Sequence, residues 1–200
     1  MTLKVIHPRN LGKWLDLMKS EGRRQLFHAM ADSVTELVRN HLSRIAPRHH
    51  ISAHRLGATP TGHIEKGARA THFTASSDSA EVIIPIPGLS RAFRPLTITP
   101  RSANALTLPI SSHSYGKRVG DLRANGWNIF QLKDVGVLMG TPPGGDGKSA
   151  DSGAVPLYVL HKRVQLKQDR SLLPSDAELG RTASTAILRY LAAFNGRRSA

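Results

Sequence analysis

The feature that most constrains this chain is a long amphipathic helix predicted near its N-terminus. Between residues 23 and 46, apolar side chains recur at helical spacing and fall on one face. The stripe consists of Phe27, Met30, Val34, Leu37, Val38, Leu42 and Ile45, with His41 among them. Pro47 follows and ends the pattern. We therefore expect a helix from about Arg23 to Ala46.

A second helix is predicted at the other end of the chain. Ser175 and Glu178 have the spacing of a capping box, which marks a helix start. Gly196 is expected to end this helix. Its buried face is predicted to contain Leu179, Ala183, Ile187, Tyr190, Leu191 and Phe194.

The region between the helices contains short apolar runs that are typical of strands. We expect strands at residues 81–87, 96–99, 105–110, 127–132, 135–139 and 155–166. The prolines of EVIIPIP, residues 81–87, cannot donate to a sheet, which favours an edge strand or an arm. Residues 127–132 and 135–139 are expected to form a hairpin, and 155–166 is the longest candidate. This order predicts an α+β fold, in which a long N-terminal helix and a C-terminal helix pack on a mostly antiparallel β-sheet, with extended loops or arms.

The domain organisation expected from the sequence is simple. A chain of 200 residues is long enough for one core of ordinary size and short for two. Residues 1–22 are interpreted as a basic lead-in with a short helix, and residues 23–200 as a single α+β domain. Within that domain, glycine and proline punctuation predicts extended loops at residues 48–80 and 141–153.

Composition narrows the classes of partner. The chain has 28 Lys and Arg against 14 Asp and Glu, a formal charge of +14, which favours a neighbouring nucleic acid, acidic protein surface or anionic lipid. It has no cysteine, which excludes disulfides, thiolate metal sites and cysteine nucleophiles. No window approaches the ~18 apolar residues of a membrane span, and no signal-like stretch opens the chain. We expect a protein of the cytosol.

Motifs for catalysis are weak. Residues 140–149, GTPPGGDGKS, end like a phosphate-binding loop, but Pro142 stands where that loop needs glycine and a second turn follows instead of a helix. The histidines of residues 49–72 lack the spacing of two metal ligands on one helical face, and we interpret them as solvated loop residues. No Gly-x-Ser-x-Gly elbow occurs. We therefore expect no enzyme, and no catalytic, cofactor or metal residues.

A group of cations carries the functional hypothesis. Its members are Arg91, Arg94, Arg101, Lys117, Arg118 and Arg123. The planar fork of arginine suits both phosphate and carboxylate. These residues can line a DNA channel and contact phosphates without reading sequence. Alternatively, they can form salt bridges to neighbouring subunits, and the sequence does not separate the two interpretations.

Several segments of the chain resemble the virion-morphogenesis or tail-completion family of tailed phages. They are RAFRPLTITPRSANALTLPI (Arg91–Ile110), SYGKR (Ser114–Arg118), VPLYVLHKRVQLKQDRSLLPSD (Val155–Asp176) and the closing helix. In that family a proline-bounded strand leads through a loop and a hairpin to a second strand, a turn and the last helix. The similarity covers roughly two thirds of the chain. It does not extend to the histidine-rich stretch or to GTPPGGDGKS.

The resemblance implies a minor structural protein of the virion, at the head-tail neck or upper tail and assembled in the host cytoplasm. Such proteins complete the tail or join it to the head as homo-oligomeric rings, here expected as a hexamer, around the DNA channel. The implied partners are other neck, connector or tail-tube proteins and the genomic DNA that passes through, without a membrane. The alternative, supported by charge, is a DNA-binding protein without sequence specificity.

Overall fold

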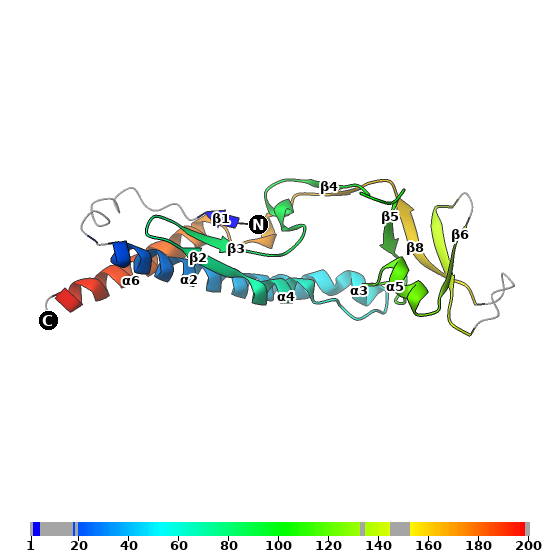
Figure 1. Ribbon diagram of the computed structural model, residues 1–200, viewed down its shortest axis with the longest axis horizontal. Coiled ribbons are helices and arrows are strands. Elements are labelled where there is room, and N and C mark those ends of the chain that lie inside the picture. Colours follow the sequence, from blue (N-terminus) through cyan, green and yellow to red (C-terminus); the bar gives the residue numbers. More distant parts are fainter. Residues whose placement is uncertain (1, 5–17, 19, 133–134, 145–152, 199–200) are drawn as a thin grey trace. The chain divides into compact units, whose positions relative to one another are not determined.

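The α+β fold expected from the sequence is confirmed by the structure, a computed structural model that describes residues 2–4, 18, 20–132, 135–144 and 153–198. All its paired strands are antiparallel, and long helices lie near both ends of the chain (Figure 1). The chain divides into two units. Unit 1 comprises Met1–Pro47, His63–Arg94 and Gln168–Ala200, and unit 2 comprises Arg48–Gly62 and Pro95–Lys167. The single domain expected over residues 23–200 is therefore divided between two units.

Unit 1 is organised around helix α2, Ser20–Ile45, which packs against helix α6, Asp176–Arg198. The same helix contacts α4, His63–Ala70, and one face of a three-stranded sheet. This sheet has the order β1-β3-β2, with β1 at Thr2–Lys4, β3 at Ala80–Ile83 and β2 at His72–Ala75. Two short 3-10 helices, η2 at Leu89–Ala92 and η3 at Arg170–Leu172, lie against each other in the same unit.

The core of unit 1 is large and draws on almost all of these elements. The predicted stripe of α2 is buried at Phe27, Met30, Val34, Val38, Leu42 and Ile45. It meets Val82 of β3, Ile84 and Ile86 beyond it, and Ile187 and Leu191 of α6. The periodicity of α2 therefore reported a real buried face.

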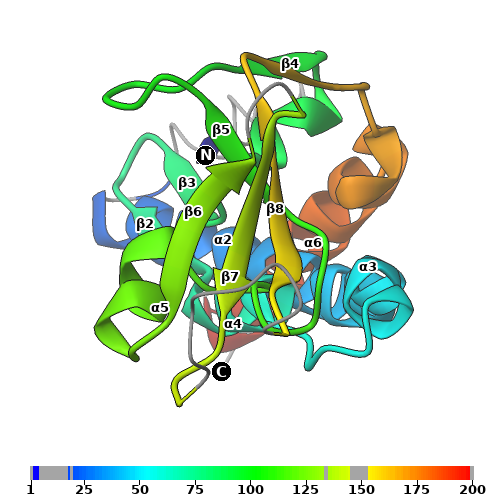
Figure 2. The same ribbon diagram turned by 90° about the vertical axis from the view of Figure 1, so that its right-hand side faces the viewer.

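Unit 2 is built on a four-stranded antiparallel sheet with the order β5-β8-β7-β6, in which β6, β7 and β8 run side by side in Figure 2. The strands are β5 at Leu106–Pro109, β8 at Val155–His161, β7 at Val137–Thr141 and β6 at Asn128–Leu132. A second ribbon pairs β4, Leu96–Ile98, with β9, Val164–Leu166. Helices α3, Ile51–Arg55, and α5, Val119–Ala124, are short. The core is small: Leu122 of α5 packs with Ile129, Leu157 and Tyr158.

The prediction of an extended loop over residues 48–80 is wrong. The 3-10 helix η1 covers Ala46–His50, and α3, α4 and β2 occupy most of the remainder. The turn residues Gly57, Pro60 and Gly62 do lie between helices. Helix α4 escaped prediction because it is short and polar, although it buries Ile64 and Ala68 in the core of unit 1. Of the second expected loop, Thr141 belongs to β7, and residues 145–152, including the second half of GTPPGGDGKS, lie outside the described residues.

Three boundaries also differ from expectation. Strand β3 is the central strand of its sheet and not an edge, because Pro85 and Pro87 follow its last residue and need not donate to it. The strand expected at 155–166 breaks at Lys162 and Arg163 into β8 and β9, which belong to different sheets. Helix α6 continues through Gly196 to Arg198. The short helix expected within residues 1–22 falls mainly on residues outside the described part.

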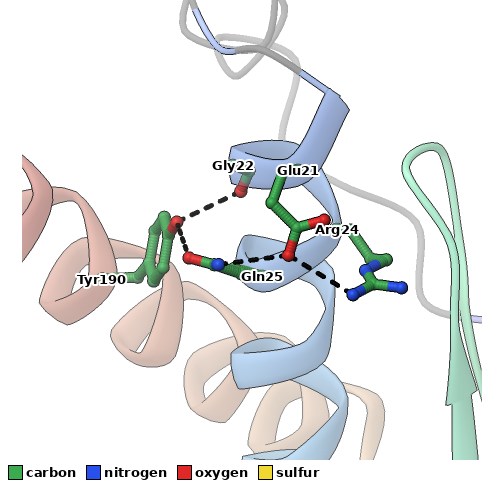
Figure 3. Close-up of polar contacts among 5 residues, drawn as sticks. All are labelled: Glu21, Gly22, Arg24, Gln25 and Tyr190. Carbon is green, nitrogen blue, oxygen red and sulfur yellow. Dashed lines mark hydrogen bonds and ion pairs between the residues drawn. The ribbon is translucent and has the colours of Figure 1, made fainter.

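The start of α6 and its attachment to α2 follow the sequence closely. The Ser175 backbone amide and hydroxyl donate to Glu178 Oε2 at 2.9 and 2.8 Å, and the Glu178 amide donates back to Ser175 Oγ at 3.3 Å. Farther along, the Tyr190 hydroxyl lies 3.2 Å from both the Gly22 carbonyl and Gln25 Oε1 of α2 (Figure 3). The predicted face of α6 therefore packs on α2, with a polar tie at its edge.

Candidate functional site

The six cations predicted as a functional group are divided between the two units. Arg91 and Arg94 belong to unit 1, whereas Arg101, Lys117, Arg118 and Arg123 belong to unit 2. The structure therefore brings together part of the predicted set, within unit 2.

Arg91 is already engaged inside unit 1. Its guanidinium lies 3.4 Å from Asp169 Oδ2, and the Asp169 amide donates to the Arg91 carbonyl at 2.9 Å. These contacts join η2 to the start of η3, which gives Arg91 a structural task. Arg94, three residues later, is exposed. Of the two, Arg94 is the better placed to meet an external anion.

Three exposed cations lie at the short helix α5: Lys117 and Arg118 directly precede it, and Arg123 is in its last turn. Arg118 precedes the helix, and its backbone amide donates to Asp121 Oδ2 at 2.9 Å. Asp121 therefore caps α5, as a carboxylate near a helix start favours. The exposed side chains of Arg118 and Arg123 form a positive surface with Lys117. Arg101 is exposed in the segment between β4 and β5.

Tyr158 fixes the segment that carries Lys117. Its ring is buried in the core of unit 2, and its hydroxyl donates to the Lys117 carbonyl at 3.0 Å. Burial raises the pKa of this hydroxyl, and the negative charge of Asp121 raises it further. The tyrosine therefore keeps its proton and its hydrogen bond throughout the physiological pH range. The cations beside α5 are thus held on an ordered surface.

Charge in unit 2 is strongly one-sided. Its described Lys and Arg residues are Arg48, Arg55, Arg101, Lys117, Arg118, Arg123, Lys162, Arg163 and Lys167. Against these nine, the described residues of the unit include one carboxylate, Asp121. Sequence reasoning missed Lys162 and Arg163 because they were assigned to a continuous strand. Three consecutive basic side chains, from His161 to Arg163, were the signal that could have identified them.

The features considered for catalysis are only partly described, because residues 145–149 of GTPPGGDGKS lie outside the described residues. Among the described residues, no group of three or more His, Asp or Glu could hold a metal ion. The histidines of residues 49–72 are distributed over η1, α3, α4 and β2. Likewise, no helix of the described chain is long and apolar enough to cross a membrane.

Unit 1 contains a cleft of about 680 Å³ beside the start of α6. Several of its polar side chains make structural contacts. Gln168 Nε2 donates to the Ala92 and Phe93 carbonyls at 3.2 and 3.0 Å, and Glu178 accepts from Ser175. The first two bonds join the end of η2 to the segment before η3, and the third caps α6.

Comparisons with known proteins place no constraint on these observations: no protein-family model, curated protein or solved structure matches the chain.

Proposed function

We propose that this chain is a structural subunit of a tailed-phage virion, located at the head-tail neck or upper tail. Copies of it form a ring around the DNA channel, and the protein acts through contacts and not through catalysis. The observation that carries the proposal is the excess of positive charge in unit 2. Its described residues include nine Lys and Arg and one carboxylate, Asp121, and its full sequence has eleven Lys and Arg and four Asp. Such a surface favours a polyanion as neighbour.

The geometry of unit 2 supports contact with phosphate more than recognition of bases. Its helices α3 and α5 have five and six residues. A recognition helix in the major groove presents several side chains to base edges, whereas exposed Arg and Lys around short elements suit the DNA backbone. This is the contact expected of a channel through which any sequence must pass.

Strand edges support assembly with further copies. Strands β5 and β6 are the two outer strands of the four-stranded sheet. An outer strand presents backbone donors and acceptors to which a neighbouring chain can add. Closed rings reuse one such contact between successive copies. The resemblance of residues 91–110, 114–118 and 155–176 to tail-completion proteins implies the same architecture, although no family model matches the chain.

Light scattering and electron microscopy test the proposal together. We expect the purified chain, alone or with a neck partner, to form a closed oligomer that persists between about 50 and about 200 mM salt. Electron microscopy of the particle should then show it in a ring at the neck or tail. A chain that stays monomeric with every neck and tail protein, and is missing from particles, contradicts the proposal.

The same charge also supports a second function, a DNA-binding protein without sequence specificity. In that case a monomer should bind duplex DNA with an affinity that falls steeply with salt. Replacing Lys117, Arg118 and Arg123 by Gln should reduce the salt slope by about 0.9 for each DNA phosphate that the variant no longer neutralises. The matched control replaces Arg69, Arg181 and Arg189, three exposed arginines of unit 1, and should leave the slope unchanged.

A further inference from the structure

The four-stranded sheet of unit 2 carries apolar side chains on both of its faces. In a strand, successive side chains point to opposite faces, and directly paired residues share a face. The covered face includes Ile129, Leu138 and Tyr158, which pack with Leu122 of α5. The opposite face we call the open face. The strand register places six apolar side chains on this face: Leu108, Val159, Val137, Leu132, Met139 and Phe130.

No side chain of the open face belongs to a buried cluster of the described chain. Phe130 is 42% exposed, Leu132 40% and Leu108 37%. An antiparallel sheet with one face in water normally carries polar residues there. Here apolar residues continue across all four strands. A contiguous exposed apolar surface of this kind marks an interaction site.

Charge at the border of the open face indicates what covers it. Beyond Val159, strand β8 leads to His161 on the same face and then to the exposed Lys162 and Arg163. The residue paired with His161 is Leu106 at the start of β5, and the exposed Arg101 lies shortly before it. The one described carboxylate of the unit, Asp121, is on α5, which packs against the covered face. The described border is therefore cationic at this end of the sheet.

We propose that the open face docks a protein partner whose contacting surface is apolar and bordered by Asp or Glu. Apolar burial supplies the affinity, and opposite charges at the rim supply orientation and selectivity. A second copy of this chain fits less well, because the described border of its own open face brings Lys162 and Arg163 and no carboxylate to meet them. This inference goes beyond the proposed function, since it specifies the chemistry of one neighbour in whatever particle the chain occupies.

Designed peptides provide the probe. Three labelled peptides of about eight residues, long enough to cross the sheet, are compared with the full chain by fluorescence anisotropy. One alternates Leu and Glu, one alternates Leu and Lys, and one alternates Thr and Glu. We expect the Leu–Glu peptide to bind at least about tenfold more tightly than either of the others, because it alone combines apolar residues with acid.

Two pairs of substitutions separate the apolar and charged contributions. Leu108→Thr with Phe130→Thr should reduce Leu–Glu binding at least about tenfold, and both side chains are exposed, so the core of unit 2 is retained. Lys162→Glu with Arg163→Glu leaves the apolar surface intact and should favour the Leu–Lys peptide instead. The controls lie in unit 1: Leu188→Thr, at a side chain that is 66% exposed, and Arg181→Glu with Arg189→Glu. Circular dichroism verifies that each variant is folded.

Three results would overturn the proposal. The first is equal binding of the Leu–Glu and Thr–Glu peptides, which would leave only general charge attraction. The second is an equal reduction of binding in the charge control of unit 1. The third is self-association of the free chain that Leu108→Thr with Phe130→Thr abolishes, because a second copy would then be the occupant.

Discussion

The two units of this chain are stabilised to different degrees and expose different surfaces. Among the described residues, the buried apolar cluster of unit 1 has 23 members, whereas that of unit 2 has four. Among the described residues, unit 1 also contains most of the carboxylates, including partners for Arg24 and Arg91, and unit 2 contains one, Asp121. The difference indicates a division of tasks. Unit 1 has the larger core, and in our proposal unit 2 presents charge and apolar surface to a neighbour.

The largest effect should come from removing α6. A chain that ends at Pro174 loses Ala183, Ala186, Ile187 and Leu191 from the core of unit 1. Each large apolar side chain contributes roughly 1.5–3 kcal/mol on burial, and a domain has only about 5–15 kcal/mol in total. We expect insoluble or unfolded protein, measured by solubility and circular dichroism.

A shorter truncation provides the control. Ending the chain at Asn195 retains every buried residue of α6 named above and should leave a folded, soluble protein. If the chain that ends at Pro174 were soluble and folded, the core of unit 1 would not depend on α6, and the contrast between the units would disappear.

Equivalent leucine-to-alanine substitutions in the two cores should lower the free energy of unfolding by different amounts. Leu42 of α2 and Leu122 of α5 are 0% and 1% exposed. Leucine to alanine in a core costs about 2–5 kcal/mol, and less where the surroundings can collapse. We expect Leu42→Ala near the upper end of this range, because many fixed neighbours surround it, and Leu122→Ala near the lower end.

Hydrogen exchange at increasing denaturant concentration measures the destabilisation by each substitution separately, because it reports the protection of amides in each unit. Leu42→Ala should lower protection in α2 and α6, and Leu122→Ala in β6 and β8. Equal destabilisation by the two substitutions would contradict the view that unit 2 is loosely packed.

The sequence predicted the parts of the fold that depend on local pattern. Helices α2 and α6 have long apolar stripes, and Ser175 with Glu178 marks the start of α6, so both were found. The hairpin of β6 and β7 was found because its strands are adjacent in the chain. Strand β3 was misplaced because its partners, β1 and β2, include a strand from the far N-terminus. Pairing between distant segments leaves no local periodicity.

The division into units and the candidate surfaces were harder to predict for the same reason. Unit 2 is discontinuous, with Arg48–Gly62 separated from Pro95–Lys167. The sequence identified Lys117, Arg118 and Arg123 as a group because they are close in the chain. It missed the open face, although NIFQL and VLMGT carry apolar residues at successive positions. That pattern indicates a sheet with two faces to cover, which becomes clear only when the register is known.

Two glycines test packing tightness in the two units by overpacking. A β-carbon at Gly67 of α4 would lie 2.0 Å from Ile86 Cγ1, and one at Gly140 of β7 would lie 2.3 Å from Leu157 Cδ1. Overpacking a core costs typically about 1–3 kcal/mol. We expect Gly67→Ala to lower the free energy of unfolding more than Gly140→Ala, because the small core of unit 2 can move. Chemical denaturation measures both. Gly67→Ala should cost less in an Ile86→Ala background, which removes Cγ1 and Cδ1, whereas the cost of Gly140→Ala should be the same there.

The smallest effect concerns acid stability and should be confined to unit 1. The amide and hydroxyl of Ser175 lower the pKa of Glu178, and the positive charges of His41 and Arg44 lower it further. A folded-state pKa below that of the unfolded chain means that the carboxylate stabilises the fold at neutral pH. This contribution is lost as the pH falls through the folded-state value. Glu178→Gln should therefore lower the melting temperature slightly at pH near 7, and the difference from wild type should shrink in acid.

The exposed carboxylate Glu36 of α2 is the control, since Glu36→Gln changes the same charge away from the helix start. A difference that stays constant from neutral to acid pH, or that matches the Glu36→Gln control, would show that the bond to Ser175 does not link protonation of Glu178 to the folding of unit 1.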